Sequence, residues 1–78
     1  MQEFSVVDIK ETGRNIAFLR KSAGMSVKNL KEVIGGISQQ AIYSWENGVR
    51  IPSTDNLVMF SEIFHVTVDD IVVRKRKV

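Results

Sequence analysis

The sequence has no cysteine and only one histidine, one proline and one tryptophan among its 78 residues. The absence of cysteine excludes disulfides and thiolate metal sites. A single histidine, His65, cannot by itself assemble a zinc site or a Ser-His-Asp triad. These shortages exclude most enzyme classes, and we expect neither catalysis nor a cofactor or bound metal.

Long apolar runs are also missing. No run of apolar residues approaches the roughly 18 that a membrane-spanning helix needs. The start of the chain, Met1-Gln2-Glu3-Phe4, lacks the basic and apolar regions of a signal peptide. We therefore expect a cytoplasmic protein with no membrane partner. Hydrophobic residues make up 44% of the chain, which suffices for one core, so the sequence predicts a single domain over residues 1–78.

The net charge of +2 is small but unevenly distributed. Basic residues outnumber acidic ones over residues 20–50, whereas residues 51–73 carry acidic residues and no lysine or arginine. We therefore expect one side of the domain to suit phosphates and another to repel them. The basic C-terminal tail, residues 74–77, is open to two interpretations: a solvated run, or a contact with phosphate or the minor groove of DNA.

Cap residues, apolar repeats and glycines divide the chain into five short helical segments. The expected N-caps are Asp8, Ser26, Ser38, Ser53 and Thr67, and Glu11 gives the first of them the spacing of a capping box. Glycines end the first three segments, at Gly24, Gly35-Gly36 and Asn47-Gly48. The pattern predicts an all-α domain with its core at about residues 8–73, in which the second and third helices form a helix-turn-helix.

The stretch from Ser38 to Gly48 is the most informative part of the chain. Ile42 and Trp45, three residues apart, mark the docking side of a short helix, and we expect Trp45 to be a core anchor. The outward side carries four polar residues: Gln39, Gln40, Tyr43 and Ser44. A glutamine amide can pair bidentately with adenine in the major groove, so we interpret this segment as a helix that reads DNA.

A longer ordered set of residues spans roughly residues 12–72. Its members are Ile16, Leu19-Arg20, Gly24-Met25-Ser26, Leu30, Gly35, Ile37-Ser38, Ile42, Trp45-Glu46-Asn47-Gly48, Pro52-Ser53, Leu57, Phe64 and Val66-Thr67-Val68-Asp69-Asp70-Ile71. This set resembles the phage-repressor/Cro (XRE-type, lambda-repressor-like) helix-turn-helix family. The resemblance implies a compact five-helix DNA-binding domain. A sequence-specific transcriptional regulator of double-stranded DNA, a repressor or autoregulator acting as a homodimer, is the function we expect.

The resemblance also implies roles for single residues. It assigns base contacts to the helix positions Gln39, Gln40, Tyr43 and Ser44. It assigns phosphate contacts to Lys28, Asn47, Arg50 and the backbone N–H groups around Gly48. Arg20 and Glu46 match positions that form a structural salt bridge, and His65 stands where the family often has a left-handed glycine. The chain departs from the family at Gly36, which looks like an insertion, at Lys31 in place of a small residue, and at Val27 in place of a glutamine.

Two questions remain open in the sequence. Residues 4–7 and 71–78 favour β structure, so these arms can be frayed, paired with each other or paired across a dimer. The segment after Ser53 carries more apolar residues than one core-facing side of a helix requires. The extra residues are Val58, Met59 and Ile63, and they predict a two-fold dimer surface there. The alternative function is a protein-interaction module on the same fold, antitoxin- or coactivator-like, whose docking patch for a second protein is formed by Val58, Met59, Ile63 and Val66.

Overall fold

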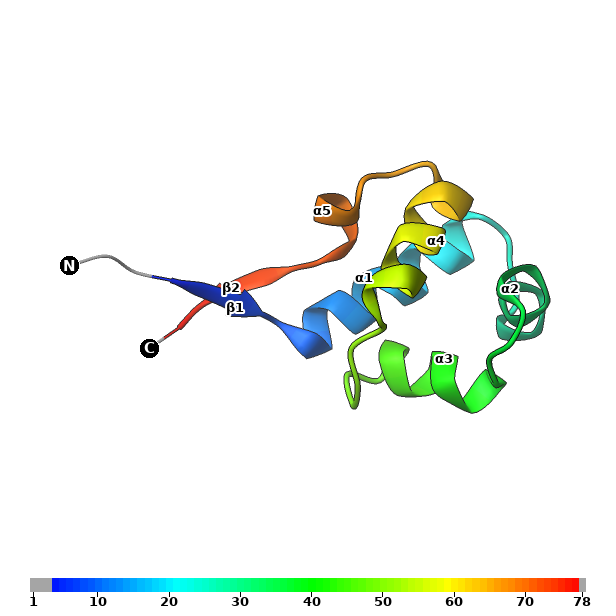
Figure 1. Ribbon diagram of the computed structural model, residues 1–78, viewed down its shortest axis with the longest axis horizontal. Helices are drawn as coiled ribbons and strands as arrows, with labels where there is room; N and C mark the ends of the chain where they lie inside the picture. The colour runs from blue at the N-terminus through cyan, green and yellow to red at the C-terminus, as the bar shows by residue number, and fades with distance from the viewer. Residues whose placement is uncertain (1–3, 78) are drawn as a thin grey trace.

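The computed structural model describes residues 4–77, which form a helical body and a two-stranded ribbon. In chain order the elements are β1 (Ser5–Val7), α1 (Ile9–Ser22), α2 (Val27–Ile34), α3 (Gln39–Glu46), α4 (Thr54–Phe64), α5 (Val68–Ile71) and β2 (Arg74–Arg76). The five helices pack together, and β1 and β2 extend from one side of them (Figure 1). The predicted five-helix fold is confirmed, and the two terminal arms, whose structure the sequence leaves open, form the ribbon.

Each helix begins at the cap residue that the sequence predicts. The side chains of Asp8, Ser26, Ser38, Ser53 and Thr67 each accept a hydrogen bond from the backbone N–H three residues later. The capping box expected at Asp8 is only half formed, because the Asp8 N–H donates to the Val73 carbonyl at 2.7 Å, and the Glu11 carboxylate accepts from Arg14 instead. Full capping boxes occur at Ser26–Asn29 and Thr67–Asp70. At the latter, the Thr67 N–H that donates to the Asp70 carboxylate is the main cause of a lowered Asp70 pKa.

The core receives one fully buried apolar side chain from every helix. These are Ile16, Leu30, Ile42, Phe60 and Ile71, each with no exposed surface. Trp45 is 7% exposed and meets Phe60 edge-on with ring centroids 5.6 Å apart, so the expectation that it anchors the core is confirmed. Burial of each large apolar side chain stabilises the fold by about 1.5–3 kcal/mol, and these contacts fix the position of α3.

The departures from the family pattern have local explanations. Val27 is buried in the core with 6% of its surface exposed, so it contributes to packing. Gly35 and Gly36 lie between α2 and α3 with φ of 72° and 68°, a region in which glycine carries no steric penalty. His65 ends α4 in the left-handed region, φ 56° and ψ 44°, as its place in the sequence predicts.

Polar side chains of α1 hold the end of α5 and the segment that follows it. Thr12 is fully buried, and its hydroxyl accepts from the N–H of Val73 at 2.9 Å. The Asn15 amide donates to the carbonyls of Asp70 and Ile71 at 2.7 and 3.0 Å. These contacts bring the C-terminal arm beside the N-terminal one.

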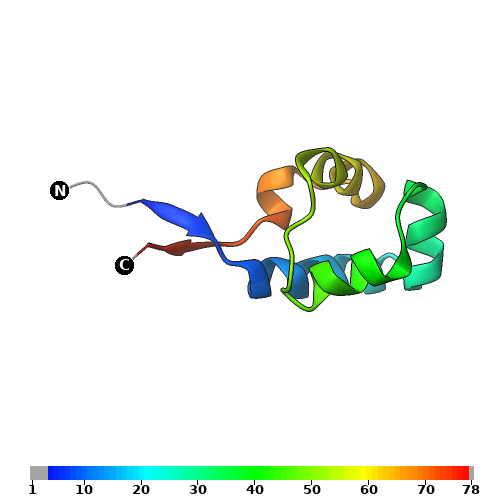
Figure 2. The same ribbon diagram turned by 60° about the horizontal axis from the view of Figure 1, so that its bottom comes forward.

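The two arms then pair with each other. β1 and β2 are antiparallel, with Ser5 opposite Arg76, Val6 opposite Lys75 and Val7 opposite Arg74. The ribbon protrudes from the helical body, and the turned view in Figure 2 shows the same arrangement. Of the three possibilities that the sequence leaves open, the structure contains the pairing of the arms within one chain. Among the described residues, no helix is long and apolar enough to cross a membrane.

Candidate nucleic-acid interface

The outward side of α3 is polar, and its inward side is apolar. Ile42 and Trp45 are buried, whereas Gln40 is exposed and Tyr43 is 48% exposed. Gln39 and Ser44 are partly buried at the margins of the exposed side. The Ser44 hydroxyl donates to the Ala41 carbonyl at 2.7 Å, which leaves its oxygen lone pairs available as acceptors. The helix lies at the lower edge of the body in Figure 1, where a ligand can approach it.

A hollow beside α3 joins the helix to the loop that follows it. Its volume is about 570 Å³. The lining residues are Ser38, Gln40, Ala41, Ser44, Trp45, Arg50, Ile51, Ser53 and Asn56. The hollow therefore brings two residues assigned to base contact, Gln40 and Ser44, next to Arg50, which is assigned to phosphate. The hollow is also lined by Asn56. In the sequence, the place of Asn56 in the first turn of α4 indicates only the start of a helix and not a binding role.

The loop after α3 offers side chains rather than backbone donors. The N–H groups of Asn47 and Gly48 donate to the carbonyls of Tyr43 and Trp45, and those of Val49 and Arg50 both donate to the Ser44 carbonyl. The expectation that backbone N–H groups around Gly48 hold phosphate therefore needs correction, because these donors close the end of α3. The side chains of Asn47 and Arg50 are exposed and remain suitable for contact.

Two lysines lie outside the hollow on neighbouring helices. Lys28 is exposed in the first turn of α2, where the resemblance implies a phosphate contact. Lys10 is exposed in the first turn of α1 and packs against Gly48, so closely that a Cβ on Gly48 would lie 2.8 Å from the Lys10 Cα. No sequence signal links residues this far apart, so the sequence does not identify Lys10 as a cation beside the loop.

An ion pair joins α1 to the last residue of α3. Arg20 Nε donates to Glu46 Oε2 at 2.6 Å and Nη2 donates to Oε1 at 3.0 Å, and the two side chains are 10% and 8% exposed. The remaining Nη1 donates to the Met25 carbonyl at 2.9 Å. The hydrogen bond to Glu46 is the main cause that raises the Arg20 pKa above its ordinary value. The expected salt bridge is therefore present, and it fixes α3 relative to α1.

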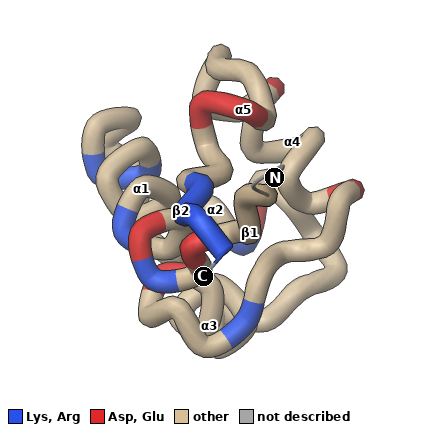
Figure 3. Tube along the Cα trace, turned by 90° about the vertical axis from the view of Figure 1, so that its left-hand side faces the viewer, with Lys and Arg blue, Asp and Glu red and all other residues tan. Residues whose placement is uncertain are grey.

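Acidic residues gather at α5, within the stretch 51–73 that lacks lysine and arginine. Figure 3 views the molecule from the ribbon end, with acidic α5 at the top and α3 at the bottom. Asp69 and Asp70 are both exposed, and Asp69 accepts from Arg74 at 2.8 Å. The only acidic residue of α3 is Glu46, which Arg20 neutralises. Within residues 4–77, no group of three histidine, aspartate or glutamate side chains is placed to hold a metal ion.

Comparison with known proteins points to the same architecture. The helix-turn-helix family model matches residues 16–71. The chain superposes on the BldD DNA-binding domain from S. venezulae with a TM-score of 0.72 and 21% identity, covering 83% of this chain and 96% of that one. A crystal structure of the DNA-binding domain of BldD gives a TM-score of 0.71, again with 21% identity, covering 83% of this chain and 93% of that one. No curated protein matches the chain.

Proposed function

The chain belongs to the XRE-type helix-turn-helix family, and from that premise we propose that it is a sequence-specific regulator of transcription that binds double-stranded DNA. We further propose that it acts as a repressor or autoregulator and as a homodimer. The observation that carries the proposal is the exposed amide of Gln40 on the same hollow as Arg50. One group suits a base edge, the other suits a phosphate, and both are held by a buried framework.

Base reading is assigned to the start of α3. The major groove of B-DNA admits an α-helix, and in helix-turn-helix proteins the N-terminal residues of the second helix contact base edges. Gln39 and Gln40 are the first two residues of α3, and Tyr43 and Ser44 follow one turn later. The glutamine amides would pair with adenine N6 and N7, while Tyr43 and Ser44 would make contacts next to them.

Phosphate binding is assigned to side chains around this helix. Arg50 and Asn47 flank Gly48 at the C-terminal end of α3, and Lys28 is exposed in the first turn of α2. We add Lys10, since it packs against Gly48 and carries its charge to the same end. Backbone N–H groups near Gly48 have no part in this proposal, because each of them is already hydrogen-bonded.

The alternative, a module whose main partner is another protein, rests on an apolar patch of α4 and the residues after it. Ile63 and Val66 pack against the core, and Met59 is partly buried, so Val58 is the exposed member of that patch at 45%. A single exposed valine is ordinary on a protein surface. We therefore prefer DNA as the main partner.

We expect Gln40→Ala to reduce affinity for the cognate site by about 1–3 kcal/mol and to relax preference at one base pair, an A·T pair. Binding to random DNA should change little, because the amide contributes no charge. Titration of duplex libraries against the wild type and the variant measures both effects. Ser22→Ala, an exposed neutral change on α1, is the matched control. Identical sequence preferences in wild type and Gln40→Ala would remove Gln40 from base reading.

Arg50→Ala should weaken binding to all sequences alike. The loss of one phosphate contact lowers the slope of log affinity against log salt by about one unit. Salt titrations on a cognate and a random duplex measure the slope. Arg14→Ala removes the same charge from an exposed position on α1 and should leave the slope nearly unchanged. If the wild type shows no salt-dependent DNA binding at all, the protein-interaction function is favoured instead.

A further inference from the structure

The outer edge of β1 has a free set of backbone hydrogen-bonding groups. Phe4 accepts from the N–H of Lys77 at 2.9 Å, and the N–H of Asp8 donates to Val73 at 2.7 Å, so the backbone groups of Phe4, Val6 and Asp8 face β2. Backbone direction alternates along an antiparallel strand. The N–H and C=O groups of Ser5 and Val7 therefore face away from β2. In the described chain β1 pairs with β2 alone, which leaves this edge open.

Apolar side chains accompany the open edge. Phe4 is 64% exposed, and Val6, Val7 and Ile9 are 37%, 40% and 39% exposed. These four lie within six consecutive positions, which makes them the densest group of exposed large apolar residues in the described chain. An open strand edge that carries exposed apolar side chains is a template for pairing with another chain.

Charge distinguishes the two edges of the ribbon. β2 consists of Arg74, Lys75 and Arg76, so two copies of β2 placed side by side would oppose like charges. β1 consists of Ser5, Val6 and Val7 and carries no charge. The edge that can pair with its own copy without repulsion is therefore the edge of β1.

We propose that the ribbon is a self-association surface, in which the β1 edges of two copies pair antiparallel about a two-fold axis. Centring the axis on Val6 sets Ser5 of each copy opposite Val7 of the other, and their facing N–H and C=O groups form four hydrogen bonds. Two ribbons then become one four-stranded sheet, with the basic β2 strands at its outer edges. This arrangement satisfies every free backbone group of Ser5 and Val7.

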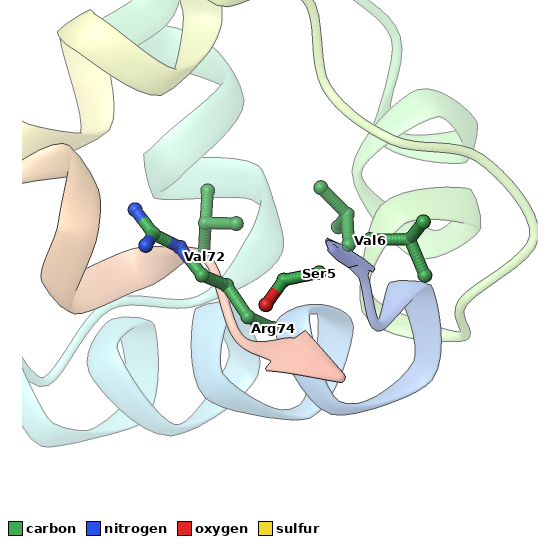
Figure 4. Close-up of a pocket in the computed structure, with 5 residues that line it drawn as sticks. Ser5, Val6, Val72 and Arg74 are labelled. Carbon is green, nitrogen blue, oxygen red and sulfur yellow. The ribbon is translucent and has the colours of Figure 1, made fainter. Parts of the chain in front are cut away.

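A hollow on the ribbon supports this pairing. It has a volume of about 330 Å³ and is lined by Ser5, Val6, Val7, Val72 and Arg74. Figure 4 shows Val6 on one side of it and Val72 on the other. By register, Ser5, Val7 and Arg74 share one face of the ribbon, and the proposed pairing places Val7 of the second copy beside Ser5 on that face. Three of the five residues that line the hollow, Ser5, Val7 and Arg74, thus share the face to which the second copy adds Val7.

This inference rests on the homodimer in the proposed function, and it replaces the surface that the sequence predicts for that dimer. The sequence points to Val58, Met59 and Ile63 on α4, but Ile63 packs against the core and Met59 is partly buried. The ribbon offers more exposed apolar surface together with unpaired backbone groups. An isologous two-fold contact through β1 places the two helical bodies, and therefore the two α3 helices, on opposite sides of the axis.

Cysteine cross-linking tests the register directly, because the chain has no cysteine of its own. In the proposed sheet Val6 faces its own copy in a non-hydrogen-bonded pair, whose Cα atoms lie about 4.5 Å apart, within the range that a disulfide spans. We expect Val6→Cys to form a disulfide-linked dimer at least about tenfold faster than Val58→Cys in dilute solution under mild oxidation. Equal rates, or faster linkage of Val58→Cys, would overturn the ribbon interface and favour α4.

Sedimentation of reduced, unmodified chains provides the second measurement. Val6→Lys puts two charges at the axis, and Ser5→Pro removes an N–H from the open edge while leaving the β1–β2 hydrogen bonds in place. Both should raise the dimer dissociation constant at least about tenfold, whereas Val58→Lys should not. A dimer that survives Val6→Lys unchanged would overturn the inference. A wild type that is monomeric at high micromolar concentration, free and on DNA, would overturn the homodimer as well.

DNA binding is measured separately, so that the two proposals fail in different ways. On a single half-site the Val6→Lys variant should bind with the affinity and salt dependence of the wild type, because the proposed base and phosphate contacts lie elsewhere. Rapid cross-linking of Val6→Cys without any DNA binding would support the ribbon interface and contradict the regulator.

Discussion

Replacement of Glu46 by alanine should lower the free energy of unfolding by about 2–4 kcal/mol, since it leaves a nearly buried guanidinium without its counter-charge. The Arg20 side chain is 10% exposed and makes two hydrogen bonds to the Glu46 carboxylate, at 2.6 and 3.0 Å. In Glu46→Ala the Met25 carbonyl remains as its single acceptor. A lost buried ion pair costs far more than an exposed one, whose typical contribution is below about 1 kcal/mol.

Urea unfolding followed by Trp45 fluorescence measures the change, because Trp45 is buried next to Glu46 in α3. Urea is preferred to guanidinium chloride, whose ions screen the charge pair. Glu46→Gln keeps the size and one acceptor, so its loss should be smaller than that of Glu46→Ala. Removing the exposed Glu11–Arg14 pair by Glu11→Ala should change stability by less than about 1 kcal/mol. An unchanged midpoint in Glu46→Ala would show that the pair adds nothing to the fold.

Gly13→Ala should destabilise the fold by about 1–3 kcal/mol or more, although alanine is the better helix former. Gly13 is buried in α1 at the point where α1 crosses the end of α3. An added Cβ would overlap the Trp45 carbonyl oxygen and would lie 2.8 Å from that of Glu46. Both obstacles are backbone atoms, so α3 as a whole must shift to admit a methyl group.

The same shift of α3 should also weaken DNA binding. α3 carries Gln39 and Gln40 at its other end, and small rotations of a helix displace its first residues from their base edges. We therefore expect Gly13→Ala to lose affinity for the cognate duplex beyond what its unfolded fraction explains. Thermal unfolding and a binding titration on the folded variant measure the two losses. Ser22→Ala on the exposed side of α1 is the control for helix propensity. Wild-type stability in Gly13→Ala would mean that the helices are not in close contact there.

The helices were predictable because their signals are local. Each N-cap side chain accepts a hydrogen bond from an N–H only three residues away, and each apolar stripe repeats within one or two turns. Neighbouring residues therefore suffice to identify the helices. The outward face of α3 follows from the same periodicity once Ile42 and Trp45 are assigned to the core. The roles of Gln39, Gln40, Tyr43 and Ser44 on DNA stay predictions.

What the sequence left open depends on contacts between distant residues. The pairing of β1 with β2 depends on hydrogen bonds of Thr12 and Asn15 to the end of α5 and the segment after it, and neither polar residue signals such a contact by its type. The approach of Lys10 to Gly48 is equally non-local. The capping box at Asp8 is half formed for the same reason, because the Asp8 N–H donates to the distant Val73 carbonyl, a contact that no local signal indicates.

The ribbon also determines when in folding the two ends of the chain can meet. β1 precedes every helix and β2 follows every helix, so their pairing closes a loop that contains the whole helical body. Loop-closure entropy makes contacts between such distant segments late ones, and here the packing of α1 against the segment after α5 must come first. A chain whose C-terminal part is unfinished has no β2 to hold β1 extended. If two copies associate through β1, only completely folded chains can therefore dimerise, and incomplete chains stay monomeric.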